Sequence, residues 1–138
     1  MSIRKIPKDT SVFHFYNANP KNRRTGDCVI RALSLFLDKS WDDVLAGLFE
    51  VAMKEKTVPT DDTCYKKYLS SLGYTMQKQP RKSDNTKYTG TEFCKKVAKS
   101  NHKYLVHIGG HHIVCISENK INDIWDSSDG CIGNYWVI

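Results

Sequence analysis

The sequence lacks a long hydrophobic run, a cysteine pair spaced as CxxC and any internal repeat. No stretch of about eighteen apolar residues is present to span a bilayer, and the first residues, MSIRKIPKDTSVFHFY, lack the apolar core and cleavage site of a secretory signal. We therefore expect the chain to stay in the cytoplasm. Its 138 residues are expected to form one domain, 1–138, with an irregular lead-in over 1–26.

Five cysteines are present, at positions 28, 64, 94, 115 and 131. An odd number without CxxC spacing does not predict a disulfide framework in a reducing compartment. Reduced thiols usually behave as small buried hydrophobic groups. We expect this of every cysteine except Cys28.

The charge pattern argues against a nucleic-acid-binding protein. The formal net charge is +6, but the basic residues are scattered and the aromatic and glycine motifs of nucleic-acid binders are missing. A basic groove could still attract an acidic partner.

The sequence does not predict a zinc site. Four potential ligands lie close together, but their spacing matches no zinc motif and strand alternation would split them between two faces: His107, His111, His112 and Cys115. No metal and no cofactor are expected.

The first half of the chain shows helical periodicity. Asp27 can cap a helix that begins at Cys28, in which apolar residues return every three or four positions. A second helix with the same period is expected to begin at Ser40 or Asp42 and to run to about Lys54.

Two further helices are expected before the final third. A third amphipathic segment runs from about Asp61 to Gly73, whose permissive φ suits a helix terminus. After a polar surface loop over 77–85, Thr89 and Glu92 have the spacing of a reciprocal capping box. This spacing predicts a short fourth helix.

The final third contains short runs rich in β-branched and aromatic residues, at 104–108, 112–116, 121–125 and 135–138. The links between these strands are too short for crossover connections, so an antiparallel sheet is expected. Helices followed by strands predict an α+β fold. In it, N-terminal helices, the first carrying Cys28, pack on a C-terminal antiparallel sheet.

Cys28 differs from the other cysteines because it lies at the first position of its helix. The unpaired N–H groups and partial positive charge of a helix N-terminus favour the thiolate. The neighbouring carboxylate of Asp27 opposes ionisation, so a nearby imidazolium is needed as well. A nucleophilic Cys28 therefore requires a histidine.

His112 is the best placed of the five histidines because it opens a strand directly after two glycines. A tight turn at 118–119 would bring Trp125 opposite His112, with Asp123 two residues away on the same face. His111 is a rival, since an irregularity at the glycines could reverse which ring faces Cys28. Asp126 and Asp129 are rivals of Asp123, but they lie in a stretch typical of a turn.

These positions predict a separate catalytic role for each residue. Asp123 would hold the His112 ring in one tautomer, while the other ring nitrogen exchanges a proton with Cys28. Trp125 would shield that hydrogen bond from water. The oxyanion donors would be the backbone N–H of Cys28 and a side chain just upstream, for which Asn22 is the candidate.

A Gly-Asp-Cys at a helix start (26–28), a later His-Ile-Val-Cys-Ile strand (112–116) and Asp-Ile-Trp (123–125) resemble the cysteine, histidine and Asn/Asp-x-Trp blocks of papain-like cysteine peptidases, in the same order. More narrowly, residues 25–32, 79–82 and 123–128 resemble a group of uncharacterised phage- and prophage-encoded proteins labelled as cysteine proteases. That resemblance covers nearly the whole chain. It implies a papain-like fold and the cytoplasm of a bacterial host.

The resemblance implies a cysteine hydrolase that acts on an amide or isopeptide bond in a protein or peptide, with a bacterial host protein among the candidate substrates. Two positions depart from papain: Asn22 stands where the oxyanion-hole glutamine is expected, and Val29 replaces the aromatic that commonly follows the nucleophile. The alternative is therefore a non-catalytic phage-encoded protein that binds and modulates a host factor. Acyl transfer to an amine instead of water is a third hypothesis.

Overall fold

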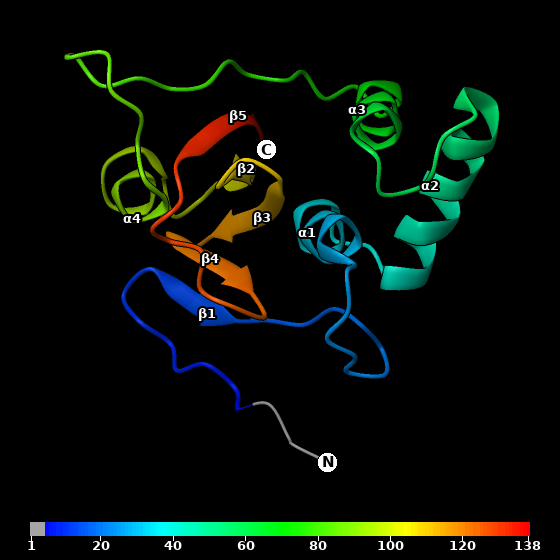
Figure 1. Cartoon of the computed structure of the whole chain (residues 1–138), viewed down its shortest axis with the longest axis horizontal. Helices are drawn as coiled ribbons and strands as arrows, with labels where there is room; N and C mark the ends of the chain where they lie inside the picture. Colours follow the sequence, from blue (N-terminus) through cyan, green and yellow to red (C-terminus); the bar gives the residue numbers. More distant parts are fainter. Residues whose placement is uncertain (1–4) are drawn as a thin grey trace.

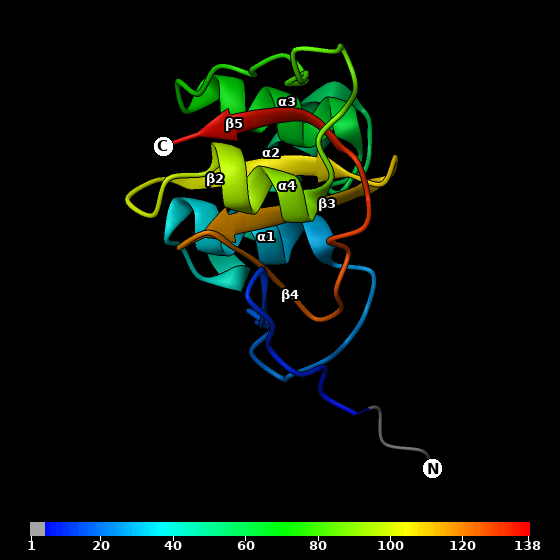
Figure 2. The same cartoon turned by 90° about the vertical axis from the view of Figure 1, so that its left-hand side faces the viewer.

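The computed structural model describes residues 5–138 as a five-stranded sheet with helices on both faces. The elements in chain order are β1 (Phe13–Phe15), α1 (Cys28–Leu37), α2 (Trp41–Glu55), α3 (Asp62–Ser71), α4 (Gly90–Glu92), a π-helical turn (Phe93–Val97), β2 (Lys103–Ile108), β3 (His112–Ser117), β4 (Lys120–Asp123) and β5 (Ile132–Val137). Helix α1 packs on one face of the sheet, with α2 and α3 outside it, and α4 covers the other face (Figures 1 and 2). The predicted α+β class is confirmed.

The sheet is mixed, so the prediction of a wholly antiparallel sheet is wrong. Its strand order is β1-β4-β3-β2-β5, and β1 runs parallel to β4 while the other pairs are antiparallel. Strand β1 lies in the segment 1–26, for which an irregular lead-in was predicted; residues 1–4 of that segment lie outside the described residues. Three residues are too few to show a strand period.

Helix α1 is the centre of the molecule. Seven of its side chains are buried, including the polar residues Arg31 and Ser34. The Ser34 hydroxyl donates to the carbonyl of Ile30 at 2.7 Å, and the Lys103 ammonium donates to the carbonyl of Leu35 at 2.8 Å. These bonds satisfy groups at the helix that water cannot reach.

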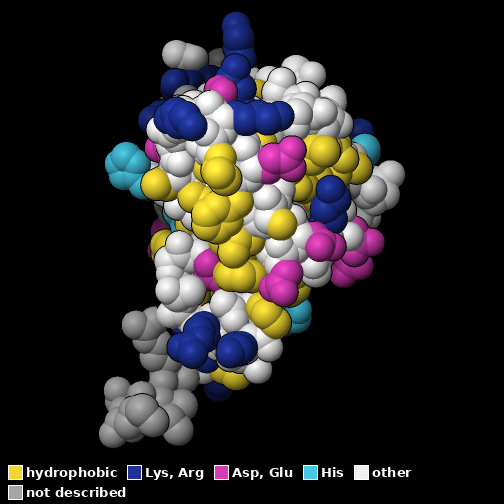
Figure 3. All heavy atoms as spheres, turned by 90° about the vertical axis from the view of Figure 1, so that its right-hand side faces the viewer, with side chains coloured by type: hydrophobic (Ala, Val, Ile, Leu, Met, Phe, Trp, Pro, Cys, Tyr) yellow, Lys and Arg dark blue, Asp and Glu magenta, His cyan; other side chains and the backbone are white. Residues whose placement is uncertain are grey.

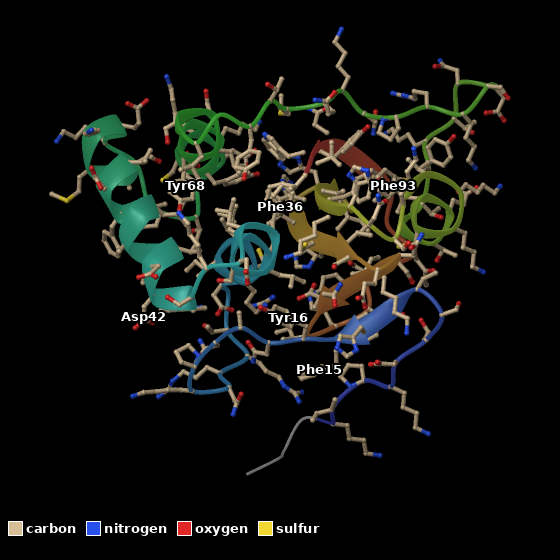
Figure 4. The ribbon with its side chains drawn as sticks, turned by 180° about the vertical axis from the view of Figure 1, so that it is seen from behind. Phe15, Tyr16, Phe36, Asp42, Tyr68 and Phe93 are labelled. Carbon is tan, nitrogen blue, oxygen red and sulfur yellow. The ribbon has the colours of Figure 1, made fainter. Side chains whose placement is uncertain are left out.

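Strand alternation divides the core into two clusters. Leu105, Ile113 and Cys115 face α1, whereas Val106 and Val114 face α4. Phe36 of α1 and Phe93, directly after α4, lie on the two sides of the sheet (Figure 4). Both sheet faces are therefore covered by helices, so a functional site on this sheet is expected at the ends of the strands.

The predicted helix starts are largely confirmed. The Ser40 side chain accepts from the N–H of Asp43 at the start of α2, and the capping box of Thr89 and Glu92 is formed in both directions. Asp27 precedes α1, but its side chain makes no capping hydrogen bond, so that part of the prediction is wrong.

The outer face of α2 is apolar and exposed. Phe49 and Met53 are 51% and 69% exposed, and hydrophobic side chains gather on this face (Figure 3). A cavity of about 450 Å³ between α2 and α3 is lined in part by Val51, Tyr68 and Leu72. None of the helices within residues 5–138 is long and apolar enough to cross a membrane.

The close approach of α4 to the loop over 126–130 yields a stability prediction. A Cβ at Gly90 would lie 2.9 Å from the Ile108 Cδ1 and 3.0 Å from the Ser128 Cα. We expect Gly90→Ala to lower the free energy of unfolding by about 1–3 kcal/mol, because backbone has to move. Urea unfolding would measure the loss. Gly26→Ala is the control, since a Cβ there meets nothing within 4 Å; equal stability of the two variants would contradict the prediction.

Candidate active site

Three element ends meet at one place in the structure. Helix α1 begins at Cys28, β3 begins at His112 and β4 ends at Asp123. The Nε2 of His112 lies 2.6 Å from the Asp123 Oδ2. Cys28 lies close enough to His112 for the two side chains to shift each other's pKa, and Nδ1 is the ring nitrogen that Asp123 leaves free. The three residues predicted from the sequence are thus brought together.

The β3–β4 hairpin sets the position of Asp123. Glu118 and Asn119 have φ of 52° and 62°, which is the left-handed conformation of a two-residue hairpin turn. The strands pair Ile116 with Ile121 and continue in the same register. This confirms the predicted turn and places the carboxylate of Asp123 within reach of β3.

Trp125 lies beyond the end of β4, so the predicted strand over 121–125 is two residues too long. Its indole still covers the imidazole of His112, with ring centroids 4.7 Å apart and planes tilted by 34°. The indole is 47% exposed. It therefore lies between the histidine ring and solvent, as expected for a shielding group.

The environment of Cys28 favours its thiolate. Burial disfavours ionisation, but the hydrogen bond to His112, the charges of His112 and Arg31, and the backbone N–H of Ile113 together lower the pKa of Cys28 below that of an ordinary thiol. The side chain is partly exposed. A reagent or substrate can therefore approach the sulfur.

The environment of His112 favours its imidazolium. Burial lowers its pKa, but hydrogen bonds to Asp123 and Cys28 and the negative charges of both outweigh burial and raise it to about 9. The pKa of the thiol falls while that of the imidazole rises, so each side chain favours the charged form of the other.

Asp123 is held by three hydrogen bonds. Besides His112, its Oδ1 accepts from the Arg31 Nη2 at 3.0 Å and from the backbone N–H of Ile124 at 2.7 Å. Both side chains of the Asp123–Arg31 pair are only 4% exposed. The carboxylate therefore has one orientation, which presents Oδ2 to the histidine.

Arg31 bridges two buried carboxylates. Its Nη1 contacts the Asp27 Oδ1 and donates to the carbonyl of Thr25 at 3.1 Å, while its Nη2 binds Asp123. The Oδ2 of Asp27 also accepts from Trp41 Nε1 at 2.9 Å and from Asn19 Nδ2 at 3.3 Å. Asp27 thus anchors Arg31 instead of capping the helix.

Sequence reasoning missed Arg31. It lies among the apolar residues of α1 without disturbing their helical period, so the pattern does not indicate that its side chain is buried or functional. Its spacing from Asp27, four residues along one helix face, was the available signal for an ion pair. Nothing in the sequence pattern gave the contact with Asp123.

The rival residues do not take the positions of His112 and Asp123, although Asp126 and Asp129 line a pocket beside His112. His111 is exposed, whereas His112 is half-buried. The Asp126 Oδ1 accepts from the backbone N–H of Ser128 at 2.9 Å, which is the predicted turn chemistry. His107 is committed to Tyr65, whose hydroxyl lies 2.5 Å from its Nε2.

The other cysteines follow expectation in three cases. Cys64, Cys94 and Cys115 are buried, and burial raises the pKa of all three thiols. Cys131 is exposed, so the prediction of a buried thiol is wrong there. It directly precedes β5, whose first residue, Ile132, takes the core position instead.

Asn22 is exposed and has a left-handed φ of 55°, with its backbone N–H bonded to the carbonyl of Asn19 at 2.9 Å. Within residues 5–138 its side chain has no hydrogen bond to the triad. Asn19 is the buried amide of this loop, but its Nδ2 is engaged by Asp27. The structure thus leaves the oxyanion role of Asn22 as a prediction.

Two pockets flank Trp125. One of about 290 Å³ includes His112, Ser127 and Asp129 in its lining. The other, of about 430 Å³, includes Lys5 and Arg24. Only the first of these two pockets includes the histidine in its lining.

Among residues 5–138, no group of three histidine, cysteine or acidic side chains is arranged to hold a metal ion. The side chains at the site are those of acid–base and nucleophilic chemistry: a thiol with a lowered pKa, an imidazole with a raised pKa and an oriented carboxylate. Comparison with family models, curated proteins and solved structures finds no match to this chain.

Proposed function

We propose that this protein is a cysteine hydrolase that cleaves an amide or isopeptide bond in a protein or peptide, through a thioester on Cys28. One observation carries the proposal: Cys28, His112 and Asp123 come together where three element ends meet, with His112 hydrogen-bonded to Asp123 and close enough to Cys28 to lower the pKa of its thiol. The order of these residues along the chain and the indole over the histidine support a papain-like arrangement.

Acylation uses the resting ion pair. The thiolate of Cys28 attacks the carbonyl carbon, and the C–N bond breaks as the Nδ1–H of His112 gives its proton to the departing amine. Asp123 keeps the ring oriented throughout, because its Oδ2 accepts from Nε2. The products of this half-reaction are a free amine, a thioester and a neutral imidazole.

Deacylation restores the ion pair. Neutral His112 takes a proton from water, whose oxygen attacks the thioester carbonyl. The C–S bond breaks and the sulfur leaves as thiolate, so the enzyme returns to imidazolium and thiolate. An amine in place of water would give acyl transfer with the same proton movements.

The oxyanion needs donors near the sulfur. The backbone N–H of Cys28 belongs to the first turn of α1, where helical N–H groups have no partner within the helix. The exposed Asn22 is the predicted second donor and would have to turn toward Cys28 on substrate binding.

The exposed position of Asn22 favours a second candidate function, a non-catalytic protein that binds a host factor on the same scaffold. Cys28→Ala separates the two hypotheses. A hydrolase loses its biological effect while binding persists, whereas a binding protein retains both.

Selective alkylation tests the proposal. We expect iodoacetamide at pH 6.5 to modify Cys28 faster than any other cysteine, because its lowered pKa gives it a larger thiolate fraction than an ordinary exposed thiol has. His112→Ala should slow this reaction by about tenfold or more, since the thiol then loses its cationic partner. Peptide mapping by mass spectrometry would follow each site.

Cys131 is the internal control, because it is exposed and lies outside the triad. Its rate should be the same in both proteins, while Cys64, Cys94 and Cys115 should stay unmodified. Even labelling of all five cysteines, unchanged by the His112 substitution, would remove the proposal.

The two pKa values predict a bell-shaped pH profile of kcat/KM. Activity should rise as pH passes the lowered pKa of Cys28, where the thiolate forms. It should fall as pH passes about 9, where His112 loses the proton needed by the leaving amine. A profile that kept rising above pH 9.5, measured on a fluorogenic amide substrate, would show that an uncharged histidine suffices.

Substitution of Arg31 tests whether its buried guanidinium stabilises the triad. Arg31→Met should lower the free energy of unfolding by about 3–5 kcal/mol, because it removes the guanidinium that two buried carboxylates share. It should also move the pH profile of Cys28 alkylation to higher pH, since the charge of Arg31 lowers that pKa. Urea unfolding and pH-dependent alkylation would measure the two effects.

Arg31→Lys separates charge from geometry. It retains the positive charge, so the alkylation profile should stay near that of the native protein, but an ammonium cannot reproduce both arms of the guanidinium. Arg81→Met is the matched control on an exposed loop, with an expected change below about 0.5 kcal/mol. Equal profiles in the Met and Lys variants would refute the electrostatic role.

A further inference from the structure

The 290 Å³ pocket beside His112 has an acidic wall. Asp126 and Asp129 line it together with the imidazole of His112 and the indole of Trp125, and none of its lining residues is lysine or arginine. With His112 protonated, two carboxylates face one positive charge. The pocket thus carries net negative charge next to the group that would protonate the leaving amine.

Ser127 lines the same pocket with an unused hydrogen-bonding group. The residue is 6% exposed, and within the described part of the chain its Oγ has no hydrogen-bond partner. A buried hydroxyl without a partner is costly, so such groups are normally paired. The Oγ itself has almost no accessible surface, so a ligand with N–H groups in this pocket would supply the missing partner after the Ser127 side chain rotates toward it.

The pocket wall is held in place by backbone bonds. The N–H of Gly130 donates to the Ser127 carbonyl at 2.9 Å, and the N–H of Thr91 in α4 donates to the Ser128 carbonyl at 3.0 Å. Asp126 binds the Ser128 N–H through Oδ1 only, so its Oδ2 is available. The acidic wall is therefore preorganised.

We propose that this pocket binds a basic side chain on the leaving-group side of the substrate. The inference rests on the proposed hydrolase function, because His112 must face the departing amine and also lines the pocket. A guanidinium or ammonium group would meet the carboxylates of Asp126 and Asp129, donate to the Ser127 Oγ and lie against the indole of Trp125.

The opposite side of Trp125 supports this assignment of charge. The 430 Å³ pocket there is lined by Lys5, Pro7, Arg24, Ile124 and Trp125, so it repels a cation. The Arg24 guanidinium is itself held by the Lys5 carbonyl at 3.1 Å and lies 5.3 Å from the ring centre of Phe15. A basic group near His112 is thus attracted to one side of the indole only.

Acyl transfer gives a direct test, because an amine acceptor occupies the place from which the leaving amine departs. Cys28 is acylated with p-nitrophenyl acetate, and the thioester is partitioned between water and arginine amide, citrulline amide or glutamate amide. Citrulline has nearly the shape of arginine without its charge. We expect arginine amide to capture the acyl group about tenfold better than citrulline amide, and glutamate amide to capture least.

In the double variant Asp126→Asn/Asp129→Asn, arginine amide and citrulline amide should capture the acyl group at rates within about twofold of each other. The asparagine oxygen can still accept from Ser128, so the loop is retained. Asp84→Asn is the control, because Asp84 makes the same kind of turn by accepting from the Thr86 N–H at 3.0 Å but does not line the pocket. It should leave the preference unchanged.

A binding measurement gives a second readout without catalysis. In Cys28→Ala protein, arginine amide should shift the NMR signals of the Trp125 indole and the His112 ring saturably, and citrulline amide should not. Ser127→Ala should weaken this binding several-fold without lowering thermal stability, since it removes a hydroxyl that has no partner in the free protein.

The outcomes separate the two proposals. If Cys28 cannot be acylated and arginine amide does not bind, both proposals fail. If Cys28 is acylated but arginine and citrulline amides capture equally well, the hydrolase stands and the basic subsite is refuted. Binding of arginine amide that survives the double Asp substitution would also refute the subsite.

Discussion

The site depends on one buried cation. Arg31 lies inside α1, 4% exposed, between the carboxylates of Asp27 and Asp123, and its charge compensates both of these buried acids. Because Asp123 is held by Arg31 on one oxygen, it presents the other to His112. The helix that carries Cys28 therefore also fixes the carboxylate that orients His112. Movement of α1 relative to the sheet would disturb both contacts at once.

The ion pair of Cys28 and His112 follows from this arrangement without any change in total charge. Passing the proton from sulfur to imidazole only redistributes charge within a cluster that already holds Asp27, Arg31 and Asp123. Burial alone disfavours both ions, yet each partner stabilises the other and Asp123 stabilises the imidazolium. Cys115, which is fully buried and has no imidazole beside it, has its pKa raised to about 12. Partial exposure and the neighbouring imidazole together thus distinguish Cys28 from the buried cysteine of the same sheet.

Sequence reasoning reached the local features and missed those made at long range. The turn at Glu118 and Asn119 fixes the register of the hairpin, so the meeting of Asp123 with His112 could be predicted from spacing alone. Strand β1 could not, because it has three residues and pairs in parallel with a strand near the other end of the chain. Asp27 was expected to cap α1 because acidic residues commonly do so; its burial beside Arg31 is a tertiary effect that no local pattern encodes.

A small fold that places its site at element ends has little depth with which to bind substrate. Cys28 lies at the first position of α1 and is partly exposed, and none of the pockets described above includes it in its lining. Selectivity then has to come from charge and from a few preorganised groups next to the reacting atoms. Trp125 is placed to provide this, because it separates an acidic pocket from a basic one while covering the His112 ring. One exposed side chain thereby connects protection of the catalytic hydrogen bond with recognition of what lies on either side of it.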